Sequence, residues 1–110
     1  MATMSVNLWW AENDGMSGHV WLGAGELLAL GGEMLLRGMA YEGSRERTGA
    51  GIPLAELAPR GREGRVSAEE VEQALDAASP ELLTLTDAKL WEDWLRFLEG
   101  AATHGGIVVR

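Results

Sequence analysis

The sequence contains no cysteine, a single lysine (Lys89), one phenylalanine and one tyrosine. Without cysteine the chain has no disulfide, no thiolate zinc ligand and no cysteine nucleophile. No apolar run approaches the roughly 18 residues that cross a bilayer. The first residues also lack the basic cluster that opens a secretory leader. We therefore expect a bacterial-type cytoplasmic protein that does not associate with membranes.

Positive charge is also scarce. The sequence has 9 basic and 17 acidic residues, so its net charge is -8. Non-specific binding to nucleic acid requires a basic surface, so we expect no nucleic-acid partner. The charge is unevenly spread: residues 37–65 carry +2 and the remainder carries -10. The acidic part would suit a basic protein partner, although acidic runs of this kind are usually simply a solvated helix face.

Catalytic motifs are missing as well: there is no Gly-x-Ser-x-Gly, no His-Glu-x-x-His and no phosphate-binding loop. Only two histidines occur, His19 and His104. With Glu12 or Asp14 they would resemble a metal or general-base site, if the fold brought them together. A simpler interpretation places His104 at the favourable end of a helix dipole. We expect no cofactor and no metal.

At 110 residues the chain matches one domain, and two segments near its start predict a β-hairpin. Residues 4–10 alternate between apolar and polar side chains, and residues 19–22 provide a returning strand. Asp14-Gly15 supplies turn chemistry between them. A β-branched segment, Ile107–Val109, can extend the hairpin into a small antiparallel sheet.

Three helices are predicted to cover this sheet, which makes the fold α+β. Leucines and methionines at helical spacing indicate one helix over about 24–42, despite Gly31-Gly32. Ser67 and Glu70 form a capping box for a second helix that ends before Pro80. A third helix starts near Asp87 and stops at Gly105-Gly106.

Two Gly- and Arg-rich segments, at about 43–51 and 59–66, are predicted to be mobile loops of this single domain, on either side of an apolar anchor at 52–57. They contain the candidate binding arginines Arg45, Arg47, Arg60 and Arg62. One interpretation is a solvated loop. The other is a clamp for an acidic partner, a phosphate or RNA, although the aromatic residues that stack bases are absent from it.

Five tryptophans stand out against the scarcity of other aromatic residues. Trp10, Trp91 and Trp94 lie on apolar faces and are predicted to anchor the core. Trp9 and Trp21, with His19, lie on the other face of the hairpin, where the two rings would form a cross-strand pair. Either a helix hides this face, or it is an exposed aromatic binding patch.

Two functions of different classes are compatible with these features. We expect a non-enzymatic protein-binding module, such as an inhibitor, an immunity-type partner or a regulatory subunit. The alternative is a small-molecule or anion-binding protein, or a minor enzyme, that uses Trp9, Trp21 and His19 with a loop arginine. Homodimerisation fits either function.

Overall fold

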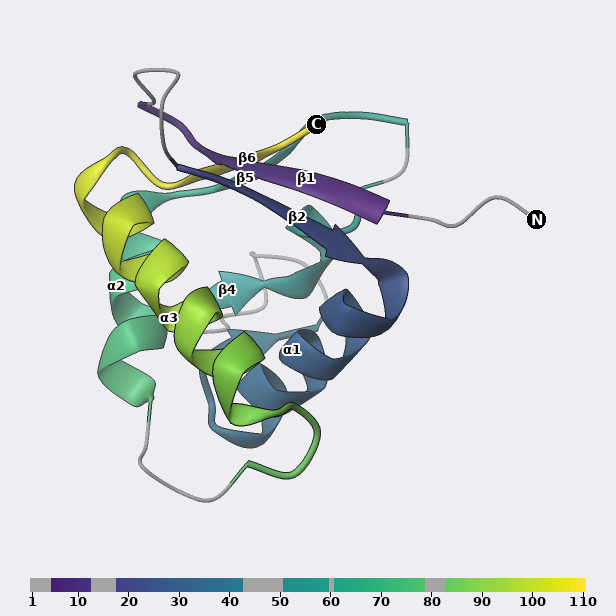
Figure 1. Ribbon diagram of the computed structural model, residues 1–110. Helices are drawn as coiled ribbons and strands as arrows, with labels where there is room; N and C mark the ends of the chain where they lie inside the picture. The colour runs from purple at the N-terminus through teal and green to yellow at the C-terminus, as the bar shows by residue number, and fades with distance from the viewer. Residues whose placement is uncertain (1–4, 13–17, 43–50, 60, 79–82) are drawn as a thin grey trace.

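The computed structural model describes residues 5–12, 18–42, 51–59, 61–78 and 83–110 (Figure 1). Its elements in chain order are β1 (Ser5–Trp10), β2 (His19–Gly23), α1 (Ala24–Leu36), β3 (Ala40–Tyr41), β4 (Ile52–Pro53), the 3-10 helix η2 (Leu54–Glu56), β5 (Gly64–Val66), α2 (Ala68–Ala77), α3 (Ala88–Thr103) and β6 (Ile107–Val109). The predicted turn at Asp14-Gly15 lies outside the described residues.

A four-stranded antiparallel sheet joins the two ends of the chain, in the order β2-β1-β6-β5. β1 and β2 form the predicted hairpin, with Leu8 opposite Val20 and Trp9 opposite His19. On its other side β1 pairs with β6, where Leu8 lies opposite Val109. The α+β fold, with a hairpin extended by a C-terminal strand and packed against three helices, is confirmed.

The helices lie on one side of this sheet, as Figure 1 shows. The side chains of β1 that face them are Val6, Leu8 and Trp10; Leu8 is buried in the core, and the other two pack against it. The opposite face of β1 carries Ser5, Asn7 and Trp9, as the period of two requires. None of the described helices is long and apolar enough to span a membrane.

The first helix runs through Gly31-Gly32 without a break, as predicted, but it ends at Leu36 and not near residue 42. Gly38 follows with a φ of 74°, a left-handed conformation that stops a helix. Leu30 and Met34 face the core, whereas Leu28 and Leu35 are exposed. The apolar arc expected on α1 is therefore wider than the part of it that the core covers.

The predicted loop at 59–66 ends in a strand, because Gly64–Val66 form β5 at the edge of the sheet. Val66 is 2% exposed and pairs with Ile107. Three residues are too short for alternation to be visible in the sequence. The apolar anchor does dock on the core: Ile52 is buried, and β4 pairs in parallel with β3. Residues 43–50, and with them most of the other predicted loop, lie outside the described residues.

Predicted core tryptophans join the last helix to the rest of the fold, with Trp94 on α3 and Trp10 on β1. Trp94 is 1% exposed, and its indole Nε1 lies 3.2 Å from Met34 Sδ on α1. Trp10 Nε1 donates to the Phe97 carbonyl at 3.0 Å, which ties β1 to α3. The Trp10 ring lies directly against Gly100, where a Cβ would overlap it. The capping box of α2 is also present, since Ser67 and Glu70 bond reciprocally at 3.1 and 2.9 Å.

One carboxylate, that of Glu33 on α1, is almost completely buried, at 1% exposure. Its Oε1 accepts the backbone N–H groups of Thr84, Leu85 and Thr86 at 3.0, 2.8 and 3.2 Å. Arg37 Nη2 lies 3.8 Å from its Oε2 and the guanidinium packs over the Trp91 ring, 5.3 Å from its centre. Glu33 thus fixes α1 to the loop that leads into α3.

The pKa of Glu33 reflects two opposing effects. Burial raises it, and the hydrogen bonds from Leu85, Thr84 and Thr86 lower it by more, so the pKa lies below its ordinary value of 4.5. The ionised carboxylate therefore stabilises the fold above about pH 4.5, and this stabilisation is lost as the pH falls through the lower, folded-state pKa.

Glu33→Gln should lower the free energy of unfolding by about 2 to 4 kcal/mol at neutral pH, because the amide NH2 that replaces Oε2 cannot accept the Thr84 hydroxyl and would face the Arg37 guanidinium, which is also a donor. Urea denaturation across pH 7 to about pH 3 should show the difference from wild type shrinking below the ordinary pKa. Glu92→Gln, an exposed change on α3, is the control and should cost little. A Glu33→Gln difference that stays constant with pH would contradict this account.

Gly100→Ala should destabilise the protein by at least about 1 to 3 kcal/mol, because the new methyl group overlaps the Trp10 ring. The matched change Gly25→Ala lies on α1 with no atom within 4 Å of the added Cβ, and it should not destabilise. Thermal unfolding of both variants checks the pair. Equal melting temperatures would show that Trp10 does not pack against α3 as described.

Candidate binding surface on the outer sheet face

The face of the sheet that no described helix covers, which we call the outer sheet face, carries an aromatic stack. The rings of Trp9 and His19 lie 3.9 Å apart at an interplanar angle of 18°. Their β-strands hold them directly opposite each other. His19 Nε2 also lies 2.9 Å from Asn7 Oδ1, so the imidazole is held by both a ring and an amide. The stack is therefore a fixed surface, and little side-chain freedom remains to be lost on binding.

This stack belongs to a row of side chains that crosses all four strands. Trp9 is opposite Val108 on β6, and Val108 is opposite Arg65 on β5. Two residues after His19 on β2, and on the same face, Trp21 lies opposite Asn7 and is 57% exposed. The direct partner of Trp9 is thus His19, and the expected Trp9–Trp21 pair is replaced by a diagonal arrangement. Among the described elements no helix covers this face, and on it Trp21 and His19 are exposed while Trp9 is half-buried.

A hollow of about 290 Å³ lies beside Trp9 on this face, and Arg65, Arg110 and Glu63 form its polar wall. Glu63 Oε2 lies 2.7 Å from Arg65 Nη2, and its Oε1 lies 4.0 Å from Arg110 Nη1. The carboxylate thus partly neutralises both guanidinium groups. All three side chains are substantially solvent-exposed, so these ion pairs orient the arginines more than they stabilise the fold.

Among the four arginines predicted to bind a partner, Arg62 is the one that lies within the described residues. Arg62 forms a two-pronged ion pair with Glu56, at 2.9 and 2.7 Å, and its Nη1 also donates to the Glu63 carbonyl. It lines a second hollow with Asn7 and Arg110 at the edge of the same face. Arg45, Arg47 and Arg60 lie outside the described residues, so their predicted role stays a prediction.

The two histidines do not meet. His19 stacks on Trp9 on the open face, whereas His104 stacks on Trp10, 4.5 Å between ring centres, on the helix-facing side. His104 Nδ1 donates to the Gly100 carbonyl at 2.8 Å, which satisfies the last turn of α3. Within the described ranges no group of three or more His, Asp or Glu side chains could hold a metal ion.

Comparisons with protein-family models, with curated proteins and with solved structures found no match for this chain. A function is therefore inferred from the residues of the outer sheet face alone.

Three residues of this face were not among the predicted site residues: Arg65, Arg110 and Asn7. Strand alternation could have identified Asn7 and Arg110, since the period of two places Asn7 on the same face as Trp9 and Arg110 on the same face as Val108. Arg65 belongs to the Arg-rich segment 59–66, but its place on the sheet was not predicted, because its strand was interpreted as a loop. The aromatic centre of the surface, at Trp9, His19 and Trp21, is where the alternation predicted it.

Acrylamide quenching of tryptophan fluorescence should distinguish the open face from the core. Trp21→Phe removes a half-exposed indole and should lower the Stern–Volmer slope of the protein. Trp91→Phe removes an indole that is 7% exposed, so the slope should stay the same or rise. Equal effects of the two substitutions would contradict the placement of Trp21.

Proposed function

We propose that this chain is a non-enzymatic protein-binding module and that the outer sheet face is its contact surface. The observation that carries the proposal is the uncovered aromatic centre: Trp21 is 57% exposed, beside the Trp9–His19 stack. Tryptophan and arginine are enriched among the residues that dominate binding energy at protein interfaces. Arg65 and Arg110 border this centre and supply a polar rim.

Charge supports a basic partner. Acidic side chains of α2 and α3 lie at Glu69, Glu70, Glu72, Asp76, Glu92, Asp93 and Glu99. Together with the net charge of -8 they attract a basic protein during encounter, and this attraction weakens as salt is added. Charge of this kind raises the association rate, while the aromatic centre slows dissociation.

The second candidate function, anion or small-molecule binding, rests on the hollow beside Trp9 and its two arginines. Glu63 weakens this candidate, because its carboxylate already occupies the position between Arg65 and Arg110 that an anion would take. A protein surface can contact the outer faces of the same guanidinium groups without displacing Glu63. The geometry therefore favours the protein-binding module.

Affinity capture from the native host, with the purified chain immobilised, should yield a stoichiometric partner that binds more weakly at high salt. Trp21→Ala should weaken binding by about 30-fold, which corresponds to about 2 kcal/mol for a central tryptophan. Leu85→Ala is the matched control, since Leu85 is 51% exposed but lies in the loop before α3. It should leave the affinity unchanged.

Absence of a stoichiometric partner would contradict the proposal, as would equal losses for Trp21→Ala and Leu85→Ala. Binding that is indifferent to salt would reject the charge-steered version. Sedimentation of the free chain at several concentrations adds one more outcome, because self-association that Trp21→Ala abolishes would identify a second copy as the partner.

A further inference from the structure

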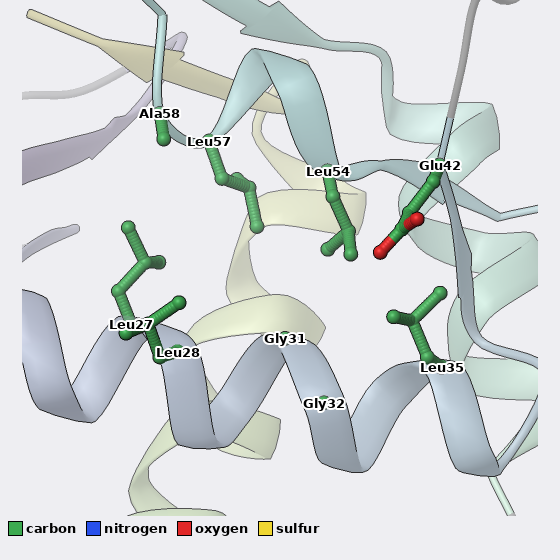
Figure 2. A pocket seen from close by; sticks show the side chains of 9 residues that line it. All are labelled: Leu27, Leu28, Gly31, Gly32, Leu35, Glu42, Leu54, Leu57 and Ala58. Carbon is green, nitrogen blue, oxygen red and sulfur yellow. The ribbon is translucent and has the colours of Figure 1, made fainter.

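A third hollow, on the helix side of the sheet, lies between α1 and the segment that contains η2. It has a volume of about 340 Å³, within the range of ligand-binding pockets. Figure 2 shows Leu54 and Leu57 projecting toward α1, with Leu27, Leu28 and Leu35 on the helix side. We call this hollow the α1 groove.

The groove exists because α1 has glycine where a larger side chain would fill the space. At Gly31, which is buried, an added Cβ would lie 3.6 Å from Leu54, in ordinary contact, so a methyl group fits there and a larger side chain projects toward Leu54. The apolar surface also continues beyond the groove, since Leu28 is 76% and Leu36 66% exposed on the same helix. Several exposed leucines on one helix are typical of a surface that another molecule covers.

One charged residue lines the groove, Glu42, and its carboxylate points into the space between Leu35 and Leu54 (Figure 2). Among the described residues no cation pairs with it. A carboxylate at the end of an otherwise apolar channel favours an occupant with apolar side chains and one positive charge. The net charge of -8 attracts such an occupant and repels a second copy of the chain.

We propose that the α1 groove binds the apolar face of a basic amphipathic helix. Leucine-like side chains at i, i+3, i+4 and i+7 of that helix lie over Gly31 and between Leu28 and Leu57, and a Lys or Arg pairs with Glu42. This site is separate from the outer sheet face, so it does not depend on the proposed function.

The test uses two fluorescein-labelled helical peptides of about 14 residues, or four turns, with leucine at the same positions. The remaining positions are lysine in one peptide and glutamate in the other. Fluorescence anisotropy at physiological salt should show binding of the Leu/Lys peptide to the wild-type chain. The Leu/Glu peptide should bind at least about tenfold more weakly.

Two variants locate the site, each with a matched control. Gly31→Leu fills the groove and should weaken the Leu/Lys peptide at least about tenfold, whereas Gly25→Leu, on the same helix with open space around it, should not. Glu42→Gln should weaken binding about 3- to 5-fold, as loss of an exposed ion pair does, and Glu99→Gln on α3 should have no effect. Glu42 is exposed, so its substitution leaves the fold intact.

Equal losses for Gly31→Leu and Gly25→Leu, or for Glu42→Gln and Glu99→Gln, would overturn the proposal, because the peptide would then be attracted to the acidic surface in general. Equal binding of both peptides would overturn it too. A wild-type chain that sediments as a dimer, and as a monomer after Leu28→Ser, would assign the groove to a second copy instead. Trp21→Ala should leave peptide binding unchanged, which separates this test from that of the outer sheet face.

Discussion

The arrangement of the helices depends on the buried carboxylate of Glu33. A charge at 1% exposure is costly unless it is fully hydrogen-bonded, and three backbone N–H groups of residues 84–86 meet that requirement. The loop that donates these bonds leads directly into α3, whose first turn Asp87 caps by accepting the Leu90 N–H. Through Trp94 and Trp10 the third helix then contacts α1 and the sheet. The buried polar interaction thus joins α1 to the start of α3, and the apolar contacts of Trp94 lie between the same two helices.

The consequence is a sheet that is covered on one side. Because α1, α2 and α3 all lie on one side of the sheet, no described helix covers the outer sheet face. Side chains that alternate outward along β1 and β2 therefore meet solvent, including two tryptophans and a histidine. The Trp9–His19 stack and the exposed Trp21 ring are a product of this one-sided packing, which is why we regard the face as a binding surface.

Local patterns in the sequence were sufficient for the hairpin, the C-terminal strand, the capping box at Ser67 and the core role of Trp94. Interactions across long separations were not visible. Nothing in helical spacing marks Glu33, because its partners are backbone groups 51 to 53 residues away. The strand at Gly64–Val66 is too short for its alternation to stand out in the sequence, and its pairing partner, β6, lies more than 40 residues further along the chain. The cross-strand register, which gives Trp9 the partner His19, also depends on pairing that no single segment encodes.

The central claim is that the outer sheet face is the contact surface of the proposed protein-binding module. Solvent exchange of the five indole N–H protons, followed by NMR on the free chain and after addition of the captured partner, tests it directly. Trp10 and Trp94 should exchange slowly in both states, since their indole groups are bonded to Phe97 and Met34. Trp21 should exchange fast in the free chain and become protected in the complex. A Trp21 proton that is already protected in the free chain, or unchanged by the partner, would contradict the account.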